Sequence, residues 1–105
     1  MPTYKRGPVK RPPTHPGELL REETLPAFHL SPAQAARDLG VSRQLLHALL
    51  AEKIGVSADM ALRLGRLTGS GPEVWLRLQE TYDLWYAKRK LGAALKAVPE
   101  RHKAA

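Results

Sequence analysis

Residues 31–53 read SPAQAARDLGVSRQLLHALLAEK, and this stretch decides the fold. The hydroxyl of Ser31 can cap a helix, Pro32 suits the first helical position, and Gln34 completes a capping-box spacing. We expect a helix from here to Gly40, because glycine readily takes the left-handed conformation that ends a helix. The first part of the stretch therefore predicts one short helix.

A second helix is expected to start at Ser42, whose hydroxyl can cap it. Leucines at helical spacing give this helix one apolar face, made by Leu46, Leu49 and Leu50. A different face carries three polar side chains, Arg43, Gln44 and His47. Because only three residues separate the two helices, they must cross steeply, and the pattern predicts a helix-turn-helix.

Two amphipathic helices joined by a glycine turn also occur in repeat proteins and bundles, where Arg43 and Gln44 would be solvated surface. The rest of the chain favours the DNA-binding alternative. Helical patterns run from Pro16 to a point before Pro26, from Ser57 to Gly69, and onward from Ser70. No segment alternates like a strand. We therefore expect an all-α domain of five helices.

The chain has 105 residues and a formal net charge of +7, which the two ends carry. The central residues 16–87 have a net charge of −2. Proline, glycine and basic residues predict a flexible basic arm over 1–13. The helix-turn-helix domain is expected at 14–90, followed by a basic tail or helix extension at 91–105. The charge favours polyanion binding, but sequence specificity must come from the central domain.

Several functional classes are disfavoured. The chain has no cysteine, and its longest apolar runs are four residues. We therefore expect a cytoplasmic protein with no membrane segment. Its four histidines are scattered, and no spacing resembles a metal site or a nucleophile and base pair. We expect no enzyme, no metal and no cofactor.

The polar side chains of the helix-turn-helix suit DNA contacts. Arg43 could pair with guanine O6 and N7, Gln44 could pair with adenine N6 and N7, and His47 is a third candidate for base contact. Four residues are candidates for backbone contacts, which set register but read no sequence: Ser42, Gln34, Arg37 and Lys53. Three aromatic residues near the end of the last helix are candidates for a homodimer interface: Tyr82, Trp85 and Tyr86. A dimer would strengthen binding to a two-fold symmetric site.

Four stretches carry a resemblance to a known family: HPGELLREE at 15–23, LGVSR at 39–43, SADMALRL at 57–64, and PEVWLRLQ at 72–79 with YDL at 82–84. With them the chain resembles the HigA family of antitoxins, a branch of the lambda-repressor-like helix-turn-helix proteins. The resemblance implies a five-helix lambda-repressor-like domain that represses its own operon as a dimer. It also implies neutralisation of a HigB-like toxin, an mRNA-cleaving ribonuclease of the RelE type.

Two positions depart from the family pattern. Pro32 stands where a phosphate-binding glutamine commonly follows the capping serine, so Gln34 is a substitute. Ala51 and Glu52 stand where Asn-Gly commonly ends the third helix. These departures leave open a toxin-binding module without operator recognition. A stand-alone regulator of the XRE type, with no toxin, is a further alternative.

Overall fold

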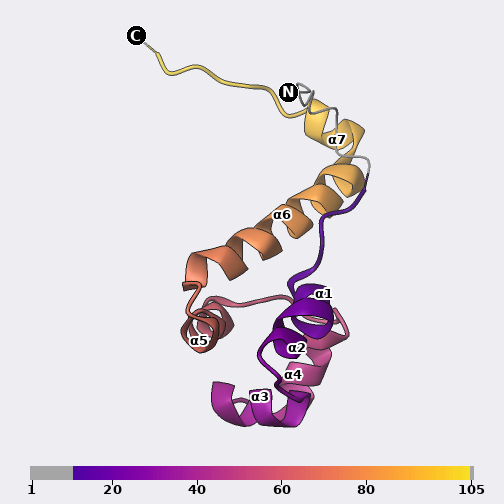
Figure 1. Cartoon of the computed structure of the whole chain (residues 1–105). Helices are drawn as coiled ribbons and strands as arrows, with labels where there is room; N and C mark the ends of the chain where they lie inside the picture. The colour runs from indigo at the N-terminus through magenta and orange to yellow at the C-terminus, as the bar shows by residue number, and fades with distance from the viewer. Residues whose placement is uncertain (1–10, 105) are drawn as a thin grey trace, which may run out of the picture.

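The computed structural model describes residues 11–104, and all regular structure within them is helical (Figure 1). The elements are α1 (Pro16–Leu19), η1 (Leu20–Thr24), α2 (Leu25–Ala27), α3 (Pro32–Leu39), α4 (Arg43–Leu50), α5 (Ala58–Thr68), α6 (Pro72–Leu91) and α7 (Ala93–Lys96). The first three elements follow one another without a break, η1 being a π-helical turn. The predicted all-α class is confirmed. Most of the predicted basic arm, residues 1–10, lies outside the described residues.

The first helix does not end where the sequence pattern predicted. It runs through Pro26 to Ala27, so the expected end before Pro26 was wrong. In a regular α-helix a proline ring collides with the carbonyl of the fourth residue before it. Here the amide of Leu25 donates to the carbonyl of Leu20, five residues earlier. This wider turn directly precedes Pro26 and explains how the helix accommodates it.

The helix-turn-helix consists of α3 and α4, and its local signals act as predicted. The Ser31 hydroxyl accepts from the amide of Gln34 at 3.1 Å, and the Ser42 hydroxyl accepts from the amide of Leu45 at 3.0 Å. Gly40 ends α3 with φ of 72°, a left-handed conformation that costs glycine little. The caps and the turn therefore set the two helix starts and the angle between them.

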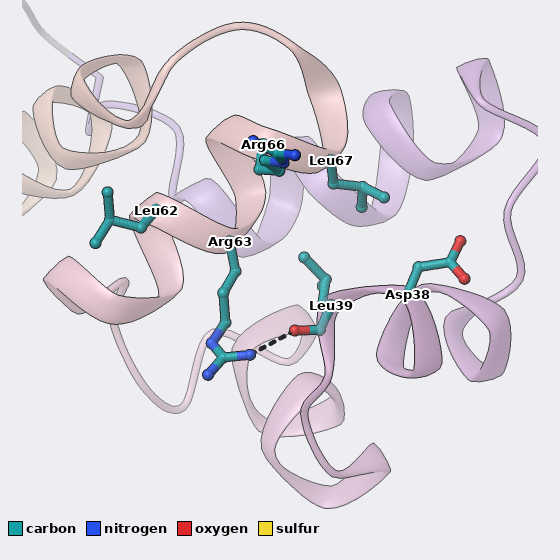
Figure 2. Close-up of a pocket in the computed structure, with 6 residues that line it drawn as sticks. All are labelled: Asp38, Leu39, Leu62, Arg63, Arg66 and Leu67. Atoms are coloured by element: carbon teal, nitrogen blue, oxygen red, sulfur yellow. Dashed lines mark hydrogen bonds between the residues drawn. The ribbon is translucent and has the colours of Figure 1, made fainter.

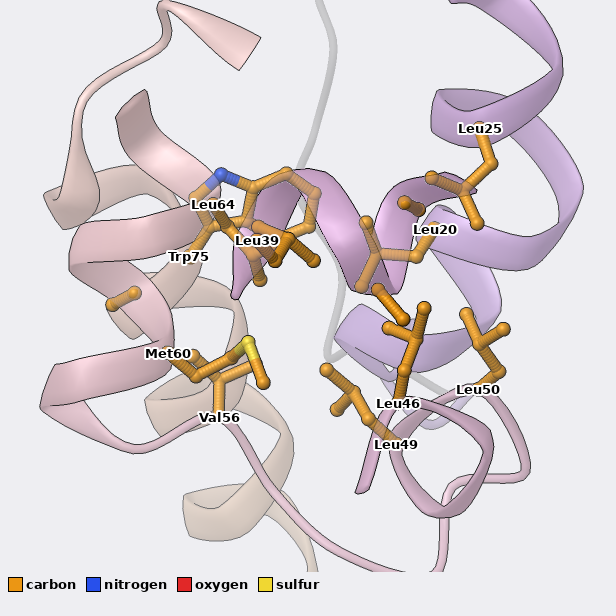
Figure 3. Close-up of a cluster of buried hydrophobic side chains, with 13 residues drawn as sticks. Leu20, Leu25, Leu39, Leu46, Leu49, Leu50, Val56, Met60, Leu64 and Trp75 are labelled. Atoms are coloured by element: carbon orange, nitrogen blue, oxygen red, sulfur yellow. The ribbon is translucent and has the colours of Figure 1, made fainter. Parts of the chain in front are cut away.

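The hydrophobic core joins α1 through α5 and the start of α6. The buried leucines of α4 lie beside Leu20 and Leu25, whereas Leu39 of α3 lies beside Leu64 and Trp75 in the same cluster (Figure 3). The predicted apolar face of α4 is fully inside, made by Leu46, Leu49 and Leu50. This packing holds α4 by its inner face and leaves its outer face available.

The C-terminal half of α6 leaves this core. Figure 1 shows it continuing, with α7, away from the body formed by α1 to α5. Gly92, with φ of 50°, separates α6 from α7, and the helical extension of the domain ends at Lys96. Within residues 11–104 no helix is both long and apolar enough to cross a membrane.

Candidate nucleic-acid interface

The outer face of α4 brings together the three candidates for base contact. Arg43, Gln44 and His47 are all exposed. The first two lie in the first turn of the helix and His47 lies one turn later. We call these three residues the reading face. Leu45 lies among them and is 43% exposed, which leaves a methyl-bearing group available for a thymine.

A side chain of α5 binds the turn between α3 and α4, which sets the direction of α4. Arg63 donates from Nη1 to the carbonyl of Leu39 at 2.8 Å (Figure 2). The same nitrogen lies 3.5 Å from the carbonyl of Gly40, and Nε pairs with Asp59 at 2.6 Å. Beside this contact lies an open groove of about 360 Å³, lined by Asp38, Leu39, Leu62, Arg63, Arg66 and Leu67. A guanidinium at these carbonyls is favourable, because the end of a helix carries partial negative charge.

Two of the candidates for backbone contact form one unit on α3. The Gln34 side chain accepts from Arg37 Nη2 at 2.6 Å and donates to Asp38 at 2.6 Å. Its backbone amide is already used by Ser31. Gln34 therefore orients the Arg37 guanidinium, and Arg37 is the side chain of this pair that carries the positive charge.

The other two candidates lie at opposite ends of α4. Ser42 caps its N-terminus, with its hydroxyl already accepting from Leu45. Lys53 is exposed in the turn that follows α4, and it is therefore separated from the reading face by the length of the helix. Beside it, Glu52 has a left-handed backbone with φ of 61° and lies 3.6 Å from Arg21. The acidic group at this end is thus paired.

Comparisons with known proteins agree with this geometry. Virulence-associated protein I of Dichelobacter nodosus is 41% identical over 83 residues, which are 79% of this chain and 77% of that protein. The solved structure of Pseudomonas aeruginosa antitoxin HigA with the higBA promoter is 41% identical with a TM-score of 0.79, and covers 89% of this chain and 100% of the other. No family model matches the chain.

The chain belongs to the HigA family. Antitoxin GraA in complex with its operator is also 41% identical, with a TM-score of 0.79 over 97% of this chain and 100% of that one. Like these HigA-type proteins, the chain is a DNA-binding helix-turn-helix regulator and not an enzyme. The family resemblance of the four sequence stretches is thereby confirmed.

The HigA-like opening stretch has a structural role that sequence reasoning did not assign. The buried His15 ring accepts from the amide of Gly17 at 2.9 Å, which caps α1. A Cβ added at Gly17 would lie 1.9 Å from the carbonyl oxygen of Leu49 in α4. Glycine at this position thus allows the first helix to touch the backbone of α4. The motif His-Pro-Gly was the visible signal, but it does not reveal the partner.

The HigA-like closing stretch fastens the loop before α5. Gln79 is buried, accepts from the amide of Val56 at 2.9 Å and donates to Asp83 at 2.9 Å. Trp75, four residues earlier, lies in the core. Both diagnostic ends of the HigA pattern therefore support the helix-turn-helix from outside it and leave the DNA face free.

The three aromatic candidates for the dimer interface form a row of edge-to-face and tilted ring contacts on α6. Tyr82 is half-buried, with its ring centroid 4.7 Å from those of both His15 and Tyr86. Burial raises the pKa of the Tyr82 phenol, and the neighbouring Tyr86 adds to this. Trp85 is half-buried beneath the Arg89 guanidinium, 3.2 Å from the ring centroid, and Tyr86 is 44% exposed. Tyr86 is therefore the aromatic of the row most available to another molecule.

Proposed function

We propose that this chain is an autorepressing antitoxin that reads its operator with α4 as a homodimer and neutralises a HigB-like toxin of the RelE type. The observation that carries the DNA part is the reading face, whose three polar side chains are exposed together on a helix that the core, the turn and Arg63 hold in place. The promoter and operator complexes of its HigA-family relatives support the same part.

In this proposal Arg43 and Gln44 contact base edges from the N-terminal turn of α4. Arginine can donate two parallel hydrogen bonds to guanine, and glutamine can pair with both groups on the adenine edge. His47 lies one turn further along the groove. Arg37, oriented by Gln34, together with Ser42 and Lys53, contacts phosphates on either side and sets the register. Pro32 lacks the side-chain amide with which the family's glutamine binds a phosphate, and in this proposal Arg37, oriented by Gln34, binds a phosphate at this end of α3 instead.

The dimer is proposed to form through the C-terminal half of α6 and through α7. Besides Tyr82, Trp85 and Tyr86, this region has exposed apolar side chains that no other described element covers: Leu84, Leu91, Leu95 and Val98. We call these four residues the α6–α7 apolar group. Water-exposed apolar side chains gathered in one region mark a contact surface, and a second copy offers a matching one.

The toxin part rests on family membership and on the antitoxin named in the related promoter complex. In a bacterium, operator DNA and the mRNA that a RelE-type toxin cleaves are both cytoplasmic, which supports a cytoplasmic location in this proposal. The test is copurification of the full-length chain with the product of the adjacent reading frame, followed by a shift assay on the upstream DNA. We expect a stable complex, protection of cells that express the neighbour, and a specific shift.

A double variant separates the two activities. Changing Arg43 and Gln44 to Ala should abolish the specific shift while leaving capture of the neighbouring protein intact, since both side chains are remote from the core. Failure of the wild-type chain to bind operator at physiological salt would leave a toxin-binding module. Operator binding without capture of the neighbouring protein would indicate a stand-alone regulator.

A further inference from the structure

Arg21 contacts the end of α4 that points away from the base-reading residues. Its Nη1 donates to the carbonyl of Leu50, the last residue of α4, at 2.6 Å. The final carbonyls of a helix have no partner within the helix and carry partial negative charge. A guanidinium from the first helix therefore binds α4 where its backbone is most receptive to a cation.

Two carboxylates hold the Arg21 guanidinium at this carbonyl. Glu22 lies 2.9 Å from Nε, and Glu52 lies 3.6 Å from Nη1. Glu22 belongs to the first helix, whereas Glu52 belongs to the left-handed turn directly after α4. The guanidinium is thus bound from both elements, and a compact ammonium group cannot reproduce this forked arrangement.

The π-helical turn η1 sets the direction of Arg21. Leu20 and Leu25 are both buried, although residues five apart point to different sides of a regular α-helix. The wider turn brings both leucines to the core, and it fixes Arg21, next to Leu20, over the end of α4. π-helical turns inside α-helices recur at functional positions.

We propose that Arg21 is a positioning residue for base readout, which sets the angle of α4 in the major groove by holding its C-terminal end. This inference rests on the proposed operator binding. Together, Arg21 and Arg63 hold the helix-turn-helix at two places: Arg63 at the turn before α4 and Arg21 at the end after it. An angular error at the far end displaces the reading face relative to the bases, whereas phosphate contacts through flexible side chains tolerate it.

The test compares Arg21→Gln with Arg77→Gln in the full-length chain. Arg77 is exposed on α6, and its side chain forms no hydrogen bond or ion pair with the described residues, so its variant loses the same charge without touching α4. Dissociation constants are measured at fixed salt for the site selected by the wild type and for unrelated DNA. The specificity ratio is the dissociation constant for unrelated DNA divided by that for the selected site. We expect this ratio to fall about threefold to thirtyfold for Arg21→Gln and to stay at the wild-type value for Arg77→Gln.

An equal loss on both DNAs would overturn the proposal, because it would make Arg21 a phosphate contact. An unchanged ratio in a folded Arg21→Gln variant would overturn it as well. If this variant does not fold, Arg21→Lys and Glu52→Gln replace it. Each keeps part of the contact, so we expect smaller decreases in the ratio, and wild-type ratios for both would overturn the proposal. A wild-type chain that does not discriminate the operator would overturn the proposed function itself, which separates the two failures.

Discussion

Helix α4 and the C-terminal half of α6 both carry apolar and polar side chains, but these are arranged in different ways. In α4 the leucines are buried and the polar side chains are exposed. In the second half of α6 the apolar side chains are exposed as well, with Leu84 at 62% and Leu91 at 49%. A helix whose apolar side is already covered can offer only polar chemistry to a ligand. A helix with an uncovered apolar side requires an apolar partner.

This difference separates two kinds of surface on one small domain. The reading face is suited to DNA, since it offers hydrogen-bond donors held by a packed helix. The α6–α7 apolar group is suited to protein, since burying apolar area is the main source of association energy. Substitutions in the reading face should therefore weaken operator binding and leave the dimer intact, whereas substitutions in the α6–α7 apolar group should weaken the dimer and, through it, operator binding.

The largest effect is expected where the packed side of α4 is broken. In Gly17→Ala the added Cβ would lie 1.9 Å from the backbone carbonyl of Leu49, so the first helix must move off α4. We expect a loss of about 3 kcal/mol or more in unfolding free energy, measured by urea denaturation. The control is Gly69→Ala, where φ is 73° but no atom lies within 4 Å of the new Cβ. It should cost only about 1 kcal/mol. Equal losses would show that close contact with α4 does not require glycine.

The second effect tests the exposed apolar side chains of α6. Leu84→Asp combined with Leu91→Asp should weaken dimerisation by about 2 kcal/mol or more, roughly thirtyfold in dissociation constant, because each buries a charge in the proposed interface. The measurement is sedimentation equilibrium. Leu62→Asp is the matched control, since Leu62 is 63% exposed on α5 and should leave the dimer intact. A dimer that persists in the double variant would place the interface elsewhere.

The local parts of this fold could be predicted from the sequence. The caps at Ser31 and Ser42 and the turn at Gly40 depend on residues within a few positions of one another, so the local pattern determines them. The exposed polar side of α4 follows from the same periodicity. The end of the first helix was missed because a π-helical turn leaves no simple periodic trace before Pro26.

The supporting contacts of the site could not be predicted, because their partners are distant in the chain. Arg21 bonds to Leu50, which is 29 residues away, and Gln79 bonds to Val56, which is 23 away. His15 meets Tyr82 across an even longer separation. Nothing in the residue types indicates these pairings. Only the folded structure shows that the most diagnostic motifs support α4 from the side opposite the reading face.

The third effect concerns the reading face itself. Arg43→Ala should cost about 1–3 kcal/mol at a single base position and relax preference there, because it removes a contact to one base edge. Binding-site selection measures this. Lys53→Ala is the comparison: it should weaken all sequences alike and lower the salt-dependence slope by about one. Unchanged preference in the Arg43 variant would remove Arg43 from the reading face.

The smallest effect lies at Glu52, in the turn directly after α4. Its left-handed backbone, with φ of 61°, is strained for any residue with a Cβ, whereas its contact with Arg21 is partly solvated. Glu52→Ala removes the ion pair and keeps the strain, while Glu52→Gly removes both. We therefore expect the glycine variant to be more stable than the alanine variant by about 1 kcal/mol, and the alanine variant to lie up to about 1 kcal/mol below the wild type. Thermal unfolding of the three proteins measures both differences. Equal stability of the two variants would mean that the turn relaxes when Glu52 is lost, so that the ion pair with Arg21, rather than the end of α4, imposes the left-handed conformation.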